Sequence, residues 1–357
     1  MNTPWSCPLN TLLVGEDGSA RYSVGVLALR EVCFARNRQT RGGTAFLRPL
    51  SIYGQRAFFM HNLHVGGGNM ESKKKGTLCV FAAALLYSIG GLCIKVIPWN
   101  GVAINGARTA IAIVVIAIYL WITKHPLRFN RWILFGAVSV FATNLLFSVA
   151  NKLTTAANSI VLQFTATIFV VLFSMIFLHR KPTKLDVAAC VIVFGGVLFF
   201  FADSLSMGGG LGNMLALLSG ITYAVIFMLN DLPNGDPISS VFWGDVISAI
   251  VGVPFLFRET DFSVVPVISI LVLGIFQVAF AYIFLTIGLR TTPAVTASLV
   301  SGIEPVLNPI LVAVFYGEEM GRFAVIGAVI VIVGVVAYNV LKEHSEVKNI
   351  EIRRRKI

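Results

Sequence analysis

From Met70 to the end of the chain, apolar runs of about 20 residues follow one another, each bounded by charged residues, proline or glycine. A helix needs roughly 17 to 25 residues to cross the hydrocarbon core of a bilayer. In lipid, only helices and closed barrels satisfy their own backbone hydrogen bonds. The pattern therefore predicts an all-α polytopic membrane protein. We expect ten transmembrane helices, at residues 77–97, 102–122, 132–150, 155–178, 185–202, 211–230, 238–257, 266–288, 293–316 and 322–341.

The composition excludes a soluble fold of this length. Hydrophobic residues make up 56% of the 357 residues and charged residues only 13%, whereas a soluble chain carries about 25% charged residues. The five cysteines form no CxxC pair and three of them lie in apolar runs, so we expect neither a disulfide framework nor a metal site. The glycine-rich turns match neither GxxxxGKS nor GxGxxG, and no nucleotide cofactor is expected.

Residues 1–69 differ from the rest of the chain. They hold seven arginines and no lysine, and their longest apolar stretch, residues 24–29, is too short to span a bilayer. Two interpretations remain open. An arginine-rich, acid-poor leader is typical of an organellar transit peptide. Alternatively the native chain starts at Met70 and the extension is non-native, because the codons for Gly-Gly-Gly-Asn before Met70 can contain a sequence that resembles a bacterial ribosome-binding site.

The basic residues outside the predicted helices are distributed unevenly. If residue 70 lies in the cytoplasm, the inner segments and the tail hold sixteen lysines and arginines, and the outer loops hold three, Lys152, Arg258 and Arg322. Cytoplasmic segments carry such an excess. We therefore expect a multi-pass protein of the cell membrane, in a bacterium the plasma membrane, with both termini in the cytoplasm. The net charge of +11 then arises from the basic residues that orient the chain in the membrane.

The tail at residues 342–357 is strongly basic. A basic segment beside a transmembrane helix is attracted to anionic lipid of the inner leaflet, although binding of nucleic acid or of a protein partner is the alternative. We expect the lipid bilayer and a small-molecule substrate as partners, and no nucleic acid. An oligomer is possible, and the sequence leaves it open.

A weak internal repeat appears when the sequence is shifted on itself by 136 to 138 residues. Its members are Gly76 with Gly212, Tyr87 with Tyr223, Thr154-Thr155 with Thr291-Thr292, and Gly196 with Gly334. Five helices per repeat is an odd number, so the second copy enters the membrane from the opposite side. Inverted repeats place a binding site near the midplane between the halves. We expect a first repeat at 70–203 and a second at 204–341.

The segment from Ala294 to Tyr338 resembles a known family. It contains Ile303-Glu304-Pro305-Val306, then Gly317-Glu318-Glu319, then Ile326-Gly327 and Gly334-Val335. This pattern is similar to the second EamA domain of the drug/metabolite transporter superfamily, and the resemblance covers about residues 76–341. It implies ten helices in two inverted five-helix repeats, and export or uptake of small metabolites, often amino acids.

The first repeat departs from that pattern. It has Thr167-Ile168 where the second has Glu304-Pro305, and Arg180-Lys181 where the second has Gly317-Glu318. We therefore expect the two halves to contribute unequally to the site.

Glu304 is the most informative polar residue, because it lies about 11 residues into a predicted span and so near mid-depth. Ionisable residues within spans are costly and usually functional. Pro305 interrupts the backbone hydrogen bonds there, and Asn308 follows one turn later on the same face. Glu304 is either a proton carrier or substrate-amine binder beside a helix break, or a protonated residue at a structural kink.

Other polar or aromatic side chains in the spans are further candidates for the substrate path. They are Arg108, Asp245, Asn144, Gln163, Gln277, Tyr87 and Tyr223. Arg108 either pairs with a carboxylate, with Glu304 as one possibility, or grips an anionic substrate; the family resemblance implies a shared structural role. Single amides often hydrogen-bond between helices instead, and tyrosines in spans often only pack. Lys95 can extend to the headgroups.

Three classes of function differ in what they require of such a sequence. A secondary transporter, most simply an exporter of small polar metabolites working by alternating access, fits the repeats, with protons or another ion as the coupling species. An uncoupled channel-like facilitator or a membrane scaffold is the alternative. An intramembrane enzyme would require HExxH, GxSxG or paired intramembrane aspartates, and the sequence has none of these, so we expect no catalytic residues.

Overall fold

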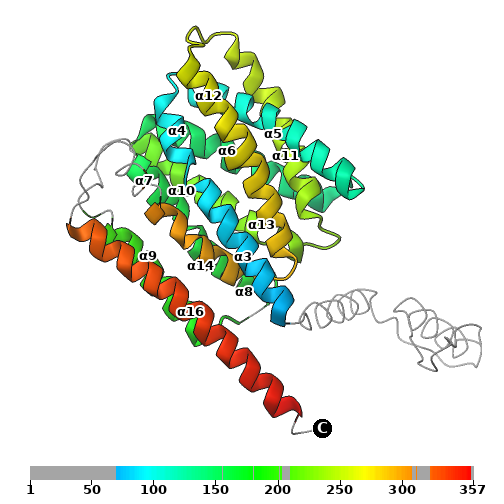
Figure 1. The fold of residues 1–357 in the computed structure, drawn as a ribbon, viewed down its shortest axis with the longest axis vertical. Helices are drawn as coiled ribbons and strands as arrows, with labels where there is room; N and C mark the ends of the chain where they lie inside the picture. The colour runs from blue at the N-terminus through cyan, green and yellow to red at the C-terminus, as the bar shows by residue number, and fades with distance from the viewer. Residues whose placement is uncertain are drawn as a thin grey trace, which may run out of the picture. The chain divides into compact units, whose positions relative to one another are not determined.

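The computed structural model describes residues 70–154, 156–179, 181–200, 202, 210–307, 311 and 322–354. Within these ranges the regular structure is entirely helical, and we group the helices into ten spans (Figure 1). In chain order the spans are α3 (Met70–Tyr87) with α4 (Gly90–Val96); α5 (Gly101–Thr123); α6 (Arg131–Leu153); α7 (Ala156–Phe164) with α8 (Ala166–Ile176); α9 (Lys184–Phe200); α10 (Gly210–Phe227), followed by η2 (Leu229–Asp231); α11 (Pro237–Leu256); α12 (Val264–Val272) with η3 (Leu273–Phe280) and α13 (Ala281–Leu289); α14 (Ala294–Val300) with η4 (Ser301–Ile303); and α16 (Arg322–Arg354).

The lengths of these helices suit a membrane. In the part of the chain that the structure describes, eight helices are long and apolar enough to cross a bilayer. The other two spans are shorter apolar helices, α9 with 17 residues and the segment Ala294–Leu307. The prediction of an all-α membrane protein with ten helices is confirmed. The leader at 1–69, Asn308 and the Gly317-Glu318-Glu319 segment lie outside the described residues.

Most helix ends lie within a few residues of the predicted ones. The largest differences are at the start of the first helix and at the end of the last helix. The first helix begins at Met70 rather than residue 77, and its first turn holds an ion pair between Lys75 and Glu71 at 2.8 Å, a spacing that stabilises helices. The last helix continues past residue 341 to Arg354, so most of the basic tail is helical. Asn100 caps α5, where its side chain accepts hydrogen bonds from the next turn.

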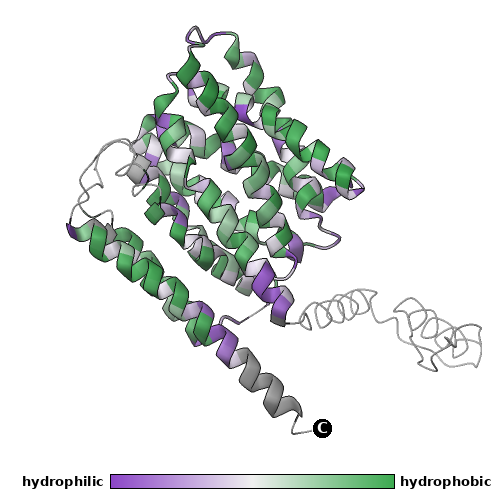
Figure 2. Ribbon diagram, in the orientation of Figure 1, coloured by the Kyte–Doolittle hydropathy of each residue, from purple (hydrophilic) through white to green (hydrophobic). Residues whose placement is uncertain are grey.

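Large hydrophobic side chains cover the outside of the bundle. Trp121, Val264 and Ile250 are 81%, 71% and 69% exposed. Figure 2 shows hydrophobic residues along the helices, with hydrophilic residues gathered at the start of α3 and toward the end of α16. A soluble protein does not expose apolar surface of this extent. It is the surface that lipid covers.

The helices of the two repeats pack reciprocally. The second span α5 lies against the seventh span α11, and the fifth span α9 lies against the tenth span α16; Figure 1 shows α9 and α16 side by side. The third span packs on the sixth as the eighth packs on the first. The second and seventh spans are equivalent in the repeat, and so are the fifth and tenth. The contact of the third span with the sixth is equivalent to that of the eighth with the first. Repeats related by a two-fold axis produce this pattern.

Paired glycines show the same relation in detail. A Cβ atom at Gly76 would lie 2.0 Å from the Thr291 hydroxyl, and one at Gly212 would lie 2.9 Å from Thr154 Cβ. Thr154 and Thr291 are equivalent in the repeat, so the contact occurs twice. The first is at the end of the bundle where α3 begins, which we call the terminal end, and the second is at the opposite end. The repeats are therefore inverted.

Three spans are interrupted near their middle. The first breaks at Ser88 and Ile89, the fourth at Thr165, and the ninth at the 3-10 turn η4. Thr165 lies 137 residues before Gly302, so the breaks in the fourth and ninth spans are equivalent positions of the repeat. The eighth span carries a π-helix, η3, and such wide turns occur often at functional sites. Interrupted helices free polar backbone groups at membrane depth, where transporters bind solutes.

Candidate functional site

Arg108 is the centre of a buried hydrogen-bond network. Its side chain has 0% exposure. Its Nη1 donates to Gln277 Oε1 in η3 at 2.9 Å, and its Nη2 donates to the carbonyl oxygen of Asn144 in α6 at 3.1 Å. Nη2 also donates to Asn105 Oδ1, one turn earlier on α5, at 3.3 Å. Arg108 thus joins the second, third and eighth spans.

A carboxylate lies in the same network. Asp245 on α11 has 0% exposure, accepts a hydrogen bond from Asn144 Nδ2 at 3.4 Å, and interacts electrostatically with Arg108. Asn144 Oδ1 in turn accepts from the Tyr282 hydroxyl at 3.2 Å. A buried polar or charged group is tolerated when it is hydrogen-bonded. Asn144 links Arg108 to Asp245, because its carbonyl oxygen accepts from Arg108 and its Nδ2 donates to Asp245.

Three tyrosines extend the network toward the ninth span. The Tyr87 ring on α3 lies 6.3 Å from the Tyr223 ring on α10 and 5.6 Å from the Tyr282 ring on α13, with interplanar angles of 87° and 80°. This edge-to-face arrangement is favourable for aromatic rings. Tyr87 and Tyr223 are equivalent in the repeat, so they meet where the two halves face each other.

Glu304 lies beside the tyrosines. It directly follows η4 and is within electrostatic range of the hydroxyls of Tyr87, Tyr223 and Tyr282. Its carbonyl oxygen accepts a hydrogen bond from Ser88 Oγ at 3.5 Å, so the break in the ninth span faces the break in the first. Glu304 keeps part of its surface accessible, whereas the next residue, Pro305, is buried.

Several polar atoms of this region have no hydrogen-bond partner among the described residues. They are the hydroxyls of Tyr87, Tyr223 and Ser301, Arg108 Nε, Asp245 Oδ2 and Asn105 Nδ2. A buried polar group without a partner costs about 1 to 3 kcal/mol, and native proteins hold few of them. Their concentration at one place indicates a site that water or a ligand fills.

The structure brings most of the sequence candidates together. Those in the cluster are Glu304, Arg108, Asp245, Asn144, Gln277, Tyr87 and Tyr223. Arg108 has Asp245 rather than Glu304 as its acidic neighbour. Gln163 is buried on α7, but no hydrogen bond joins its side chain to the cluster in the described ranges. Asn308 lies outside those ranges.

Two members of the network were missed in the sequence. Asn105 precedes Arg108 by three residues and so shares its face of the helix, a spacing that the sequence displays. Tyr282 stands in a span with Phe276, Phe280 and Phe284, and nothing in the sequence distinguishes it from packing aromatics. It follows Gln277 by five residues, a spacing that the π-helix η3 brings toward the same side.

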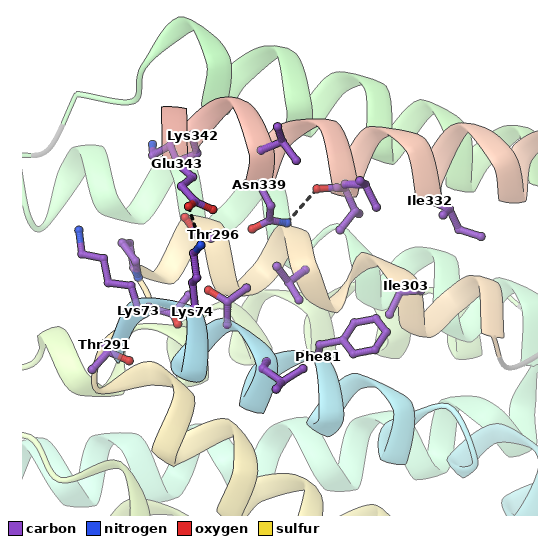
Figure 3. A pocket seen from close by; sticks show the side chains of 18 residues that line it. Lys73, Lys74, Phe81, Thr291, Thr296, Ile303, Ile332, Asn339, Lys342 and Glu343 are labelled. Atoms are coloured by element: carbon purple, nitrogen blue, oxygen red, sulfur yellow. Dashed lines mark hydrogen bonds and ion pairs between the residues drawn. The ribbon is translucent and has the colours of Figure 1, made fainter. Parts of the chain in front are cut away.

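A groove of about 420 Å³ opens between α3, α14 and α16 at the terminal end (Figure 3). Its rim carries Lys73, Lys74, Lys342 and Glu343, and Lys74 pairs with Glu343 at 2.8 Å across it. Its walls are mostly apolar, with threonines and Asn339 among them, and they extend to Ile303, the residue before Glu304.

Beside this groove, a second polar cluster ties three spans together. Asp186 on α9 accepts hydrogen bonds from the Tyr338 hydroxyl at 2.8 Å and from Lys342 Nζ at 2.6 Å, both on α16. The Tyr338 hydroxyl also lies 3.1 Å from the Thr296 hydroxyl on α14. The terminal end therefore combines a groove with a hydrogen-bonded cluster that links the fifth, ninth and tenth spans.

At the opposite end, hydrogen bonds close the loops over the bundle. Asn100 Nδ2 donates to Glu259 Oε1 at 2.6 Å, and Trp99 Nε1 donates to the carbonyl oxygen of Asp261 at 2.7 Å. Lys95 donates to the carbonyl oxygen of Thr154 at 2.9 Å, and Lys152 donates to the carbonyl oxygen of Ile97. Lys95 thus links the end of α4 to the end of α6.

The chain is similar to known transporters and to a solved structure. The model of the EamA-like transporter family matches residues 74–202 and 210–340. The uncharacterized transporter YyaM of Bacillus subtilis (strain 168) is 26% identical over 247 residues, which are 64% of this chain and 80% of the relative. An uncharacterized transporter of Clostridium kluyveri is 28% identical over 60% of this chain and 73% of the relative. A solved crystal structure shares the fold, with a TM-score of 0.64 and 18% identity over 75% of this chain and 98% of its own.

Proposed function

The chain belongs to the EamA-like transporter family and is a multi-pass membrane transporter, and from that premise we propose that it is a secondary transporter. We propose small polar metabolites, such as amino acids, as its substrates and export as its direction. Alternating access around the midplane between the two repeats is the proposed mechanism. Protons or another ion supply the energy.

The observation that carries this proposal is the buried polar cluster around Tyr87. Its members come from both repeats, with Arg108, Asn144 and Tyr87 in the first and Asp245 and Glu304 in the second. A charged cluster at membrane depth is costly and marks a solute or ion pathway in most membrane proteins. Its position between inverted repeats is where transporters bind their substrates.

The difference between the two ends of the bundle supports alternating access. The opposite end is closed by hydrogen bonds such as Asn100 to Glu259, whereas the groove at the terminal end reaches Ile303 beside Glu304. A transporter in one of its two states is open toward one side and closed toward the other. The equivalent breaks in the fourth and ninth spans provide flexible points for the exchange between these states.

We place the terminal end in the cytoplasm of a cell with this protein in its plasma membrane. The support is the charge bias, since Lys73, Lys74, Lys181, Lys184 and Lys342 belong to segments at that end. Basic residues are retained on the cytoplasmic side of a membrane. Anionic inner-leaflet lipid is then the surface next to the helical tail.

Purified full-length protein in proteoliposomes tests the transport proposal. A pH gradient is imposed, and uptake of labelled amino acids, amines, organic acids and sugars is compared with uptake by protein-free vesicles. We expect at least one class of solute to accumulate above its equilibrium level and to be lost when a protonophore collapses the gradient. Equilibration without accumulation under any imposed ion gradient would indicate an uncoupled facilitator. The absence of flux for every class would contradict transport.

A further inference from the structure

The tyrosine cluster holds hydroxyl groups without partners. The Tyr87 and Tyr223 hydroxyls are 94% and 92% buried with their residues and have no hydrogen-bond partner among the described residues. Both interact electrostatically with the Glu304 carboxyl group, and Ser88, the residue after Tyr87, donates to the carbonyl oxygen of Glu304. A carboxylate only accepts and a hydroxyl oxygen can also accept, so a ligand that donates N–H groups satisfies all three.

The charge of the cluster indicates which kind of donor fits. Both Nη atoms of Arg108 donate within its own network, and Glu304 is not among the groups that interact electrostatically with Arg108. No cation of the described residues forms an ion pair with Glu304, and the rings of three tyrosines surround its side of the cluster. Aromatic faces attract cations. A carboxylate beside aromatic rings recognises a positive charge, and free hydroxyl acceptors recognise N–H groups.

We propose that this cluster binds the protonated primary or secondary amino group of an organic cation, with Glu304 as its counter-charge and the Tyr87 and Tyr223 hydroxyls as hydrogen-bond acceptors. The proposal rests on the proposed transport function and narrows its substrate class from amino acids to amines that carry no carboxylate. One unbalanced carboxylate matches a single positive charge, so a simple amine is preferred to a zwitterion, whose carboxylate would have to compete for Arg108, where both Nη atoms already donate to other residues.

A proton and the amine compete for Glu304. Without substrate the carboxyl group is protonated, because an ionised carboxylate deep in the bundle has no other compensation. When an ammonium group binds, the carboxyl proton leaves and the ammonium takes its place, so one positive charge is exchanged for another. The titratable groups that face Glu304 are Tyr87 from α3, Tyr223 from α10 and Tyr282 from α13. α9 and α16 also pack on η4, and no titratable group on their described residues interacts with Glu304.

Binding of butylammonium to the purified full-length protein tests this assignment directly. Thermal stabilisation reports binding, and a pH indicator in weak buffer reports proton release. We expect up to one proton released per bound amine, and an apparent affinity that rises by up to about tenfold per pH unit while Glu304 is protonated. 1-Butanol and butyrate, the neutral and anionic analogues, should bind at least about tenfold more weakly, and so should the zwitterion 2-aminobutyrate.

Variants separate the parts of the site. Glu304→Gln should lose butylammonium binding by at least about tenfold together with proton release, while its melting without ligand stays near wild type. Glu71→Gln, which removes an exposed carboxyl group at the start of α3 outside the groove, is the matched control and should bind normally. Tyr87→Phe with Tyr223→Phe should weaken butylammonium but leave tetramethylammonium, which has no N–H group, unchanged.

The assignment is overturned if 1-butanol or 2-aminobutyrate binds as tightly as butylammonium, if binding releases no proton or ignores Glu304→Gln, or if no amine binds and water alone fills the cluster. Transport of other solutes in the proteoliposome panel would then leave the transport proposal standing. Amine binding with proton release but without flux of any solute would support the amine site and contradict the transport proposal.

Discussion

Arg108 owes its place in the membrane interior to its partners. It is fully buried, and it donates to Gln277 Oε1 and to the carbonyl oxygen of Asn144. Arg108→Gln would leave these two acceptors without their donor, and a buried polar group left without a partner costs about 1 to 3 kcal/mol. We therefore expect a clearly lower melting temperature in detergent. A glutamine variant as stable as wild type would contradict a structural role for these hydrogen bonds.

Single residues also show how far the sequence predicts the site. Glu304, Arg108 and Asp245 were found because an ionisable residue within an apolar run requires a reason. Tyr282 was not found, because a tyrosine among phenylalanines carries no such signal. The sequence also did not predict that Arg108 and Asp245 belong to one network, since the two residues are far apart in the chain and come near each other only because α5 packs on α11.

At the scale of helices, glycine contacts set how closely spans approach. A Cβ atom at Gly106 on α5 would lie 2.2 Å from the backbone of Gly252 on α11, and a backbone cannot move aside as a flexible side chain does. Gly106→Val should therefore separate α5 from α11 and sharply reduce the yield of monodisperse protein on gel filtration. Gly195→Val on α9 is the control, because a Cβ atom there meets nothing within 4 Å of the described structure. Equal behaviour of the two variants would contradict the close crossing.

The lengths of the apolar runs predict the helices, but the sequence predicts the interruptions of the helices only in part. Pro305 predicted a break in the ninth span, and η4 begins at Ser301, whose carbonyl would otherwise accept from the missing N–H. The breaks at Ser88 and Thr165 have no proline. They occur where spans touch: Ser88 donates to the carbonyl of Glu304, and a Cβ atom at Gly220 would lie 2.8 Å from the Thr165 hydroxyl. Such breaks depend on tertiary packing, which periodicity does not reveal.

At the scale of the whole molecule, the two repeats share a frame but differ in charge. Glu304 in the second repeat corresponds to Thr167 in the first, which donates to the carbonyl of Ser298 at 3.5 Å instead of carrying a charge. The inverted repeat was predicted from a few matched positions, and the reciprocal glycine contacts at Gly76 and Gly212 confirm it. The ninth span therefore carries an ionisable residue at a position where the fourth span carries a neutral one.

Gradient-driven transport by Glu304→Gln in proteoliposomes, beside wild type and Glu71→Gln, tests the role of Glu304 most directly. Glutamine keeps the size and hydrogen bonding of glutamate but cannot titrate. With a normal melting curve, Glu304→Gln should lose at least about tenfold of the transport rate, a loss of about 1.4 kcal/mol or more in transition-state stabilisation, and its remaining activity should no longer depend on pH. Glu71→Gln should retain both the rate and the pH dependence. A wild-type rate and pH profile for Glu304→Gln would show that Glu304 is structural, and the coupling role would pass to Arg108 and Asp245.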